Sequence, residues 1–226
     1  MMKDLGLGVH AIEGSLSMLP GVSLPLRSTI LESNSGEVVV VSPVGGVASW
    51  GPKVAALGPV RTVVAPNGFH HMYLQDAWNH FTSASRWTSV AVRGEFETFP
   101  PNVIWLAGED PWTLADGVVA MPVLGMERVQ EWVLFHERSK TLVVTDLLFN
   151  ILEPGFGLGL AQRFFGTYKK LAVSKLFMRA CTDRRAFTAS LRAIEELGCE
   201  RLVMAHGEPV LSGAGEQVRE AFRAAP

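Results

Sequence analysis

The strongest constraint on this chain is an expected buried strand that runs directly into a pair of histidines. Arg61–Ala65 contains a β-branched run typical of such a strand, and Pro66–Gly68 ends it. The apolar residues that follow are spaced at i, i+3, i+4 and i+7, as on one face of a helix: Leu74, Ala77, Trp78 and Phe81. The sequence therefore predicts that His70 and His71 lie in the first turn of a helix, just beyond a strand end.

Two other expected strands also end in a side chain that can bind a metal ion. Asp146 follows the apolar run Thr141–Thr145, and His206 follows Arg201–Ala205. The positive end of a helix dipole disfavours imidazolium, so the paired histidines are expected to be neutral, which is the form that binds metal. Because strand ends hold their side chains rigidly, these three places together predict a metal centre.

Composition limits the partners and the location of the chain. It has 226 residues, of which 48% are apolar and 19% charged, so it can bury a sizeable core. A net charge of −2 offers no electrostatic footprint for nucleic acid. No uncharged apolar run reaches the about 18 residues of a membrane span, and none follows Met1–Asp4 as in a signal peptide. Because Cys181 and Cys199 lie outside any CxxC pattern, we predict a cytoplasmic protein with reduced thiols.

Hydrophobic periodicity and turn residues predict the elements. The expected strands are Val9–Ser17, Ser28–Glu32, Val38–Val41, Arg61–Ala65, Thr88–Val92, Val103–Leu106, Val118–Val123, Glu131–His136, Thr141–Thr145 and Arg201–Ala205. The expected helices outside the histidine segment are Ser49–Leu57, Arg184–Leu197 and Gly215–Arg223. Strands grouped first, then helix and strand alternating, indicate one α/β or α+β domain over residues 1–226, with helices on its outer faces.

The segment from Leu147 to Met178 is apolar and aromatic around a glycine-rich centre. Three interpretations are open. It forms one or two core helices joined by a glycine-rich bend, it is a mobile lid over a pocket, or it contacts a membrane surface through basic residues such as Lys169 and Lys170. The small number of basic residues makes the third the weakest.

The order of the metal-capable motifs resembles the metallo-β-lactamase superfamily. Hydrolases of that family carry a His-x-His-x-Asp-His turn after a strand, a later lone histidine, a bridging aspartate at a strand end, and a final histidine in a Gly-His-Gly-like turn. Here Leu142–Leu148 resembles the bridging-aspartate strand, and Met204–Pro209 resembles the last turn. The resemblance covers roughly residues 8–210. It implies a four-layer αββα sandwich as the fold class of a single domain.

Two motifs are most similar to a divergent, uncharacterised branch of that superfamily, the DUF4336-like proteins. The branch has a Pro-Asn-x-x-His-His turn, which Pro66–His71 matches. It also has a Thr-Leu-x-x-x-Asp-Leu-x-Phe-Asn stretch, which Lys140–Asn150 contains.

The chain departs from the superfamily pattern at half of the usual ligands. If His71 corresponds to the last histidine of the family turn, His70 replaces its aspartate, while Gly68 and Pro66 replace its first two histidines. The later lone histidine falls near residues 125–127, where this chain has none. The resemblance therefore implies that the usual three-histidine metal site is absent.

What remains is a set of four candidate ligands, His70, His71, Asp146 and His206. The resemblance implies that they hold one divalent metal ion, zinc in preference to iron. Asp146 and His71 are the residues expected to act in catalysis. Adjacent residues at a helix start point about 100° apart, so one histidine of the pair can ligate while its neighbour orients or caps. The structural alternatives stay open: a hydrogen-bonded histidine at 71 or 206, and a helix N-cap at Asp146.

Other titratable residues are weaker candidates. A two-metal site needs a contribution from Glu109, Glu127 or Glu131. Glu131 is interpreted first as a hydrogen-bonded strand end, and Glu109 as a turn residue. The three remaining histidines are interpreted as surface or core residues: His10, His80 and His136.

The predicted function is a metal-dependent hydrolase whose metal activates water against an ester, lactone or related bond of a small molecule that the sequence does not identify. One alternative is a degenerate binding or scaffold domain, for which we expect no metal and a pocket filled by Phe69 and Met72. An iron redox or oxygen-handling site is the weaker alternative. The apolar content is also compatible with a homodimer.

Overall fold

The computed structural model describes residues 1–226 and contains two β-sheets. The first sheet has seven strands in chain order: β1 (Met2–Gly6), β2 (Val9–Leu19), β3 (Val22–Glu32), β4 (Val38–Val41), β5 (Val60–Ala65), β6 (Ser85–Ser89) and β7 (Val103–Leu106). Strands β1 to β4 pair antiparallel, and β4 to β7 pair parallel. The change of direction at β4 places the carboxyl ends of β4 and β5 at one edge of the sheet.

The second sheet has five strands in the order β12 (Arg201–Met204), β11 (Thr141–Val144), β10 (Trp132–His136), β9 (Val118–Pro122) and β8 (Trp112–Ala115). The β10–β11 hairpin is antiparallel, as its polar loop predicts. Strands β11 and β12 pair parallel, with Val144 opposite Met204. Their carboxyl ends therefore lie side by side, and the residues that follow them, Asp146 and His206, leave the sheet at the same edge.

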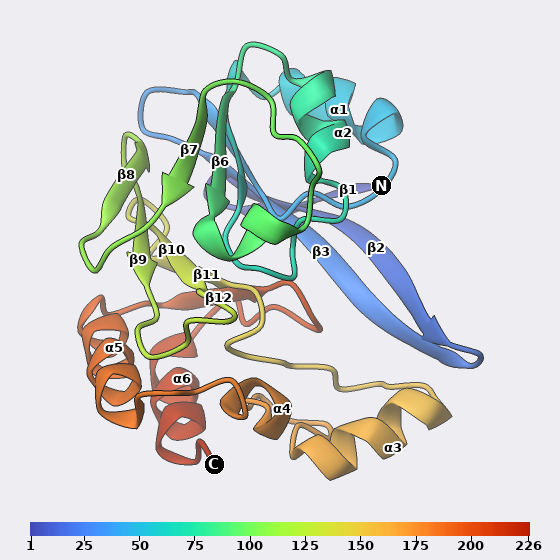
Figure 1. Cartoon of the computed structure of the whole chain (residues 1–226), viewed down its shortest axis with the longest axis vertical. Coiled ribbons are helices and arrows are strands. Elements are labelled where there is room, and N and C mark those ends of the chain that lie inside the picture. The colour runs from blue at the N-terminus through green and yellow to red at the C-terminus, as the bar shows by residue number, and fades with distance from the viewer.

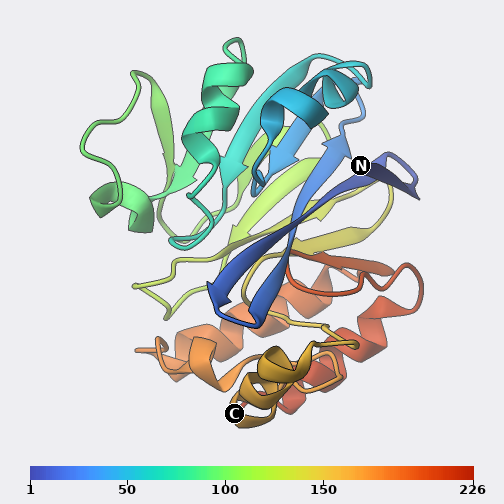
Figure 2. The same cartoon turned by 90° about the vertical axis from the view of Figure 1, so that its right-hand side faces the viewer.

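The two sheets pack face to face, and helices cover both outer faces (Figures 1 and 2). Helices α1 (Val47–Ala55) and α2 (Leu74–His80) cover the first sheet, and α5 (Arg184–Glu196) and α6 (Ala214–Arg223) cover the second. In β4, Val39 and Val41 face the core between the sheets, whereas Val38 and Val40 face the helices. Burying each such side chain contributes about 1.5–3 kcal/mol. The predicted four-layer αββα sandwich is confirmed.

A long hairpin extends from the first sheet. From Val22 to Ser28, β3 pairs only with β2. These parts of the two strands are joined by a tight turn at Pro20–Gly21 (Figure 1). We call residues Glu13–Leu26 the β2–β3 arm. The expected start of this strand at Ser28 was wrong: β3 begins at Val22 and runs through Pro25, because a proline is tolerated where a strand has no second neighbour.

The arm lies beside helix α3 (Phe156–Phe165), which contacts β3. A side chain at Gly157 would meet the Val22 side chain at 2.7 Å, so α3 approaches the arm closely there. Gly166, at a φ of +79°, ends α3, and a short helix, α4 (Lys175–Met178), follows. Residues 147–178 thus contain two helices joined by a glycine bend, but α3 lies at the surface, with Phe156, Leu160 and Phe164 exposed, so it is not the core helix that the first of the three interpretations expects. None of the helices has the length and apolar character needed to cross a membrane.

Three local predictions differ from the structure. Helix α2 begins at Leu74, so the paired histidines lie in the turn before it and not in its first turn. The strand expected at Thr88–Val92 is β6 followed by a 3₁₀ turn over Val90–Gly94, which Ser89 caps by accepting a hydrogen bond from the Ala91 amide. The short strands β1 and β8 were missed.

Candidate metal centre

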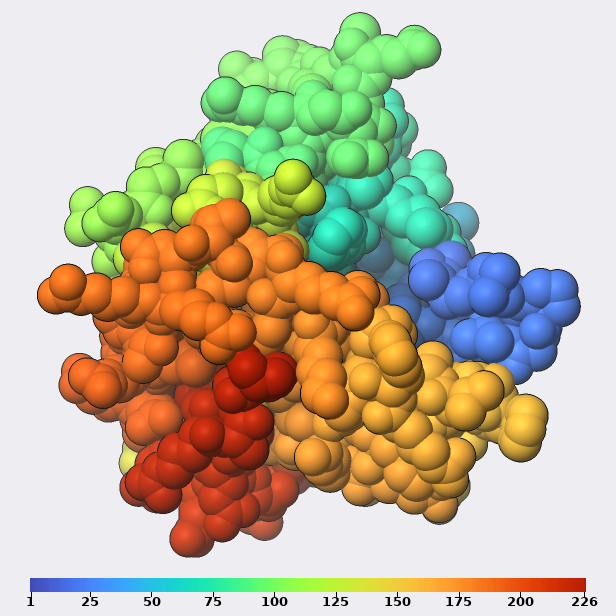
Figure 3. All heavy atoms as spheres, turned by 60° about the horizontal axis from the view of Figure 1, so that its bottom comes forward, coloured from blue at the N-terminus to red at the C-terminus, as the bar shows by residue number.

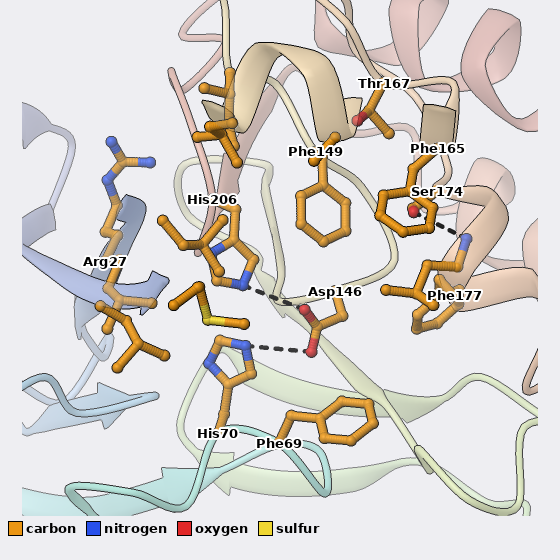
Figure 4. A pocket seen from close by; sticks show the side chains of 18 of the residues that line it. Arg27, Phe69, His70, Asp146, Phe149, Phe165, Thr167, Ser174, Phe177 and His206 are labelled. Atoms are coloured by element: carbon orange, nitrogen blue, oxygen red, sulfur yellow. Dashed lines mark hydrogen bonds and ion pairs between the residues drawn. The ribbon is translucent and has the colours of Figure 1, made fainter. Parts of the chain in front are cut away.

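Three of the four predicted ligands meet at the edge where the two sheets come together. His70 comes from the β5–α2 turn, Asp146 follows β11, and His206 follows β12. The carboxylate of Asp146 lies between the two rings (Figure 4): its Oδ2 is 3.3 Å from His70 Nε2, and its Oδ1 is 3.2 Å from His206 Nε2. All ligand atoms of this His–Asp–His cluster lie within 4.8 Å of one another.

The surroundings of His206 favour a positive charge between it and Asp146. Its Nδ1 lies 2.8 Å from the Pro25 carbonyl oxygen, which only accepts hydrogen bonds, so Nδ1 carries a proton. Its Nε2 faces a carboxylate, which also only accepts. A lone pair aimed at a carboxylate is repulsive, so a proton on Nε2 or a metal ion between these two atoms would stabilise the arrangement.

The pKa values agree with this arrangement. Burial by itself would raise the pKa of Asp146, but the charges and hydrogen bonds of His70 and His206 hold it well below its usual value. Burial would lower the pKa of His206, but the hydrogen bond to Asp146 and its charge raise it above the usual value. The aspartate is therefore ionised, and the site favours a cation.

The loop that carries His206 is held by β3. The buried guanidinium of Arg27 donates through Nη1 to the carbonyl oxygens of Met204, at 2.8 Å, and Gly207, at 2.6 Å. Its charge is paired with Glu13 Oε1, 3.0 Å from Nη2. Arg27, in β3 of the first sheet, thus holds the backbone before and after His206, which follows β12 of the second sheet.

Phe149 and Asn150, at the end of the Lys140–Asn150 motif, also hold the turn that carries His206. The Phe149 ring stacks on His206, with ring centroids 5.1 Å apart and an interplanar angle of 10°. Asn150 donates its amide to the His206 carbonyl and its side chain to the Glu208 carbonyl. Gly207 has a φ of +109°, and a side chain there would meet the Asn150 backbone at 2.2 Å. Only glycine fits this position.

Asn67 connects the histidine turn to the aspartate. Its Oδ1 accepts the backbone amides of Phe69 and His70, which closes the turn after the proline. Its Nδ2 donates to Asp146 Oδ2 at 2.6 Å and to Thr145 Oγ1 at 2.9 Å. One buried amide side chain therefore positions both His70 and Asp146.

Glu131 is fully buried behind the aspartate. Its carboxylate accepts the backbone amides of Thr145, at 2.8 Å, and Asp146, at 2.9 Å. Burial and the neighbouring charge of Asp146 raise the pKa of Glu131 to about 7. Its oxygens are engaged by backbone amides, so it orients the strand end and is not one of the clustered ligands, in line with the first interpretation of this residue.

His70 is oriented by Ser42, which the sequence analysis did not single out. The Ser42 hydroxyl lies within hydrogen-bond distance of His70 Nδ1, on the ring side away from Asp146. Ser42 directly follows β4 and has a φ of +51°, an unusual conformation for a residue other than glycine. Its position after an all-valine strand is the same signal that pointed to Asp146 and His206. Arg27 and Phe149 carried no comparable signal.

The structure does not bring His71 into the cluster. Its Nδ1 lies 2.7 Å from the Gly68 carbonyl oxygen, and its Nε2 lies 3.4 Å from Glu95. The ring packs edge-on against Phe96. Of the adjacent histidines, one therefore faces the aspartate and the other faces the 3₁₀ segment.

The remaining candidates also lie outside the cluster. Glu127 is exposed and bonded to Thr182, and Glu109 is exposed. His10 and His136 are buried and hydrogen-bonded, and His80 is exposed. At the position of the family's second histidine, a side chain on Gly68 would meet Ala91 Cβ at 3.0 Å, so there is little room for a ligand.

The clustered donors fit one small divalent cation. The two short distances run to different oxygens of Asp146, and the ligand atoms of the three residues lie within 4.8 Å of one another, so small side-chain shifts would bring them to the bond lengths of about 2.0–2.1 Å that zinc requires. Two imidazole nitrogens and one carboxylate oxygen are ligands that zinc accepts, and a fourth position is left for water or substrate.

The cluster opens into a cavity of about 670 Å³, lined by 28 residues of which 19 are hydrophobic. The arm, the turn carrying Phe69 and Met72, and helices α3 and α4 form its walls. The side chains of Phe69 and Met72 are more than half exposed. They line the cavity and do not fill it.

Comparison with solved structures shows the class of fold: the chain has the metallo-β-lactamase fold. It aligns over 99% of its length with 99% of a metallo-β-lactamase from Pontibacter korlensis, at 11% identity and a TM-score of 0.65. A metallo-β-lactamase from Hirschia baltica aligns with 98% of this chain over 97% of its own, at 14% identity and a TM-score of 0.66. FIM-1 from Pseudomonas aeruginosa, in its mono-zinc form, aligns with 99% of this chain over 94% of its own, at 10% identity and a TM-score of 0.68.

No family model matches the chain, and no curated protein matches it. The comparisons therefore establish the fold, and the function has to be argued from the site.

Proposed function

We propose that this protein is a metal-dependent hydrolase with a mononuclear site formed by His70, Asp146 and His206. The observation that carries the proposal is the His–Asp–His cluster at the strand ends, open to a cavity on one side. Zinc is the proposed ion, because two imidazoles and a carboxylate suit it. The mono-zinc form of a similar structure supports a single ion.

His71, a predicted ligand and catalytic residue, has no place in the proposed site because its ring faces Glu95. A divalent ion held by the cluster supplies a Lewis acid that lowers the pKa of water for attack on an ester, lactone or related bond. The chain's own residues fix the geometry: Asn67 and Glu131 hold the Asp146 carboxylate, and Arg27 holds the turn of His206. The surrounding apolar walls exclude bulk water from the reacting bond.

The test is elemental analysis of protein purified without affinity metal or chelator. We expect about one zinc per chain in wild type, the same in His71→Ala, and none in His206→Ala. His80→Ala, which removes an exposed histidine, is the matched control and should keep its metal. Wild type without metal, or His71→Ala without metal, would overturn the proposed site.

One observation favours a second function, a degenerate domain that binds a ligand without hydrolysis. Pro66 and Gly68 stand where relatives of the resembled family carry histidines, so half of the usual metal machinery is absent. The open cavity differs from the filled pocket expected for such a domain. Folded wild-type protein that contains no metal and hydrolyses no ester would favour this function. An absorbance spectrum of anaerobically purified protein tests the iron alternative.

We also propose the finer placement in the DUF4336-like branch, which the Pro66–His71 and Lys140–Asn150 motifs support. Both motifs line the site, the first through the histidine turn and the second through Asp146 and Phe149. The cytoplasmic location, the lid and the homodimer stay predictions.

A further inference from the structure

The cavity beside the His–Asp–His cluster has walls built for an apolar ligand. One wall is the inner face of the β2–β3 arm, where the register places Leu16 opposite Leu24. The apolar residues of this wall are Leu16, Met18, Val22, Leu24 and Leu26. Since side chains alternate along a strand, one face of the arm is almost continuously aliphatic.

The facing wall comes from the segment 147–178. Its apolar residues toward the cavity are Phe149, Ile151, Leu158, Ala161, Phe165, Leu176 and Phe177. Figure 3 shows the arm, in blue, beside this segment, in yellow-orange, on one face of the molecule. In Figure 4, Phe149, Phe165 and Phe177 lie on one side of Asp146 and extend the apolar surface away from it.

The polar groups of the cavity are mostly engaged with the protein. Arg27, the one cationic side chain of the lining besides the histidines, is paired with Glu13 and bonded to two carbonyls. Ser174 accepts the Leu176 amide, and Ser42 is bonded to His70. No charged group of the walls is free for a phosphate, a carboxylate or a sugar.

Gln162 is the exception among the wall residues. It is buried, and its Nε2 donates to the Ile151 carbonyl at 3.4 Å, while its Oε1 has no partner. Because this oxygen is inaccessible to solvent, it is not available to a ligand, and the hydroxyls of Tyr73 and Thr167 are the remaining polar groups of the lining.

We propose that the cavity binds a long acyl chain, with the ester or lactone carbonyl of the substrate at the His–Asp–His cluster and the chain between the arm and α3. The inference rests on the proposed hydrolase function for the reaction and on the cavity walls for the chain. In the reaction, water adds to the carbonyl carbon and the acyl–oxygen bond breaks. An ester gives a fatty acid and an alcohol, and a lactone gives a single hydroxy acid; in both, the leaving oxygen takes one of the water protons.

The first test is a chain-length series of p-nitrophenyl esters with the zinc-loaded protein. Each methylene that enters an apolar site raises kcat/KM about fourfold, so hexanoate, with four more methylenes, should exceed acetate by about 200-fold to 250-fold. The gain should continue toward decanoate until the cavity is filled. A value of kcat/KM that is flat or falls from acetate to decanoate would overturn the inference.

The second test measures binding without turnover. Calorimetric titration should give saturable binding of decanoate to wild-type protein and far weaker binding of acetate, which shares the carboxylate but lacks the chain. Decanoate binding without hydrolysis of any ester would support the cavity and overturn the hydrolase. Ester hydrolysis without chain preference, together with equal binding of the two acids, would overturn the cavity and leave the hydrolase standing.

A pair of variants on α3 tests whether the acyl chain of the substrate lies against this helix. Ala161→Phe adds a ring on the cavity side of the helix and should shift the preferred ester to a shorter chain. Leu160→Phe adds the same ring to a neighbouring residue that is 61% exposed and outside the cavity lining, so its chain-length profile should match wild type. Equal profiles for both variants would show that the chain does not lie against α3.

Discussion

At the scale of single residues, the His–Asp–His cluster depends on side chains that are not themselves among its three donors. Asn67 is the clearest case, because its two polar atoms hold different parts of the centre. Its oxygen closes the turn of His70, and its nitrogen donates to Asp146. A carboxylate at this position would still close the turn, but it would remove the donor and add a charge beside Asp146 and Glu131.

We therefore predict that Asn67→Asp lowers the free energy of unfolding by about 3 kcal/mol, because a buried carboxylate loses its donor and gains a like charge. Metal content should fall as well. Urea unfolding and elemental analysis measure the two effects. Asn102→Asp makes the same chemical change at an exposed residue and should cost no more than about 0.5 kcal/mol. Equal stability of the two variants would contradict the role given to Asn67.

The sequence predicted the site where polar residues follow apolar strands. His70, Asp146 and His206 each stand just beyond such a strand end, and the structure places them together. Adjacency in sequence could not decide between His70 and His71, because the direction of each ring depends on Ser42, Glu95 and Phe96, which come from other elements. Arg27 was missed for the same reason, since its partners lie about 180 residues away.

At the scale of elements, the β12 turn shows how backbone contact fixes a ligand. Gly207 follows His206 at a positive φ and lies against the backbone of Asn150. Gly213 also has a positive φ, of 64°, but a side chain there would meet nothing within 4 Å. Substituting the two glycines therefore distinguishes two costs. At Gly213 only the positive φ matters, whereas at Gly207 the added side chain also collides with Asn150.

We predict that Gly213→Ala destabilises the protein by about 1–2 kcal/mol, the cost of the left-handed conformation alone. Gly207→Ala should cost more than about 3 kcal/mol and should also release the metal, because the turn must move away from Asn150. Thermal unfolding and metal content of both variants provide the measurement. If Gly207→Ala keeps its metal and resembles Gly213→Ala, the turn is not held as described.

The elements themselves were predicted well where both faces of a strand are buried and less well at sheet edges. Strands such as Val38–Val41 are apolar on both faces, so their burial is encoded locally. The edge strands β1 and β8 were missed because partly exposed residues leave little alternation to detect. Pro25 misled the prediction of β3, since a proline is compatible with a strand only where it has no second neighbour, and that depends on the tertiary structure.

At the scale of the whole molecule, the cluster joins the two sheets. His70 belongs to the first sheet, whereas Asp146 and His206 belong to the second, and Arg27 crosses between them in the same place. A metal ion bound there would therefore stabilise the packing of the sheets as well as the site. Its effect should depend on pH, because protons compete for the same atoms.

The sign for metal-free protein follows from the shifted pKa values. His206 has a pKa raised above 6.5, so its stabilising effect is present below that pH and is lost as the pH rises through the raised value. Glu131 has a pKa raised from 4.5 to about 7, so the folded protein loses stability as the pH rises through that range and the buried carboxyl ionises. This change has the same direction as that of His206. Asp146 acts oppositely, since its lowered pKa removes stability only below about pH 3.8.

We predict that chelator-treated protein loses stability as the pH rises from 6.5 to 8.5, whereas zinc-loaded protein does not. A bound ion would be held by His206 and Asp146 in place of a proton, and its charge would offset the repulsion that Asp146 exerts on Glu131. Thermal unfolding at several pH values, with chelator or with excess zinc, measures the difference, which should be largest at pH 8.5. In the metal-free state, Glu131→Gln should lose the part of the slope between pH 4.5 and 7. A metal-free protein whose stability is constant from pH 6.5 to 8.5 would show that the folded state does not bind a proton more tightly at His206, and the predicted pH dependence would fail.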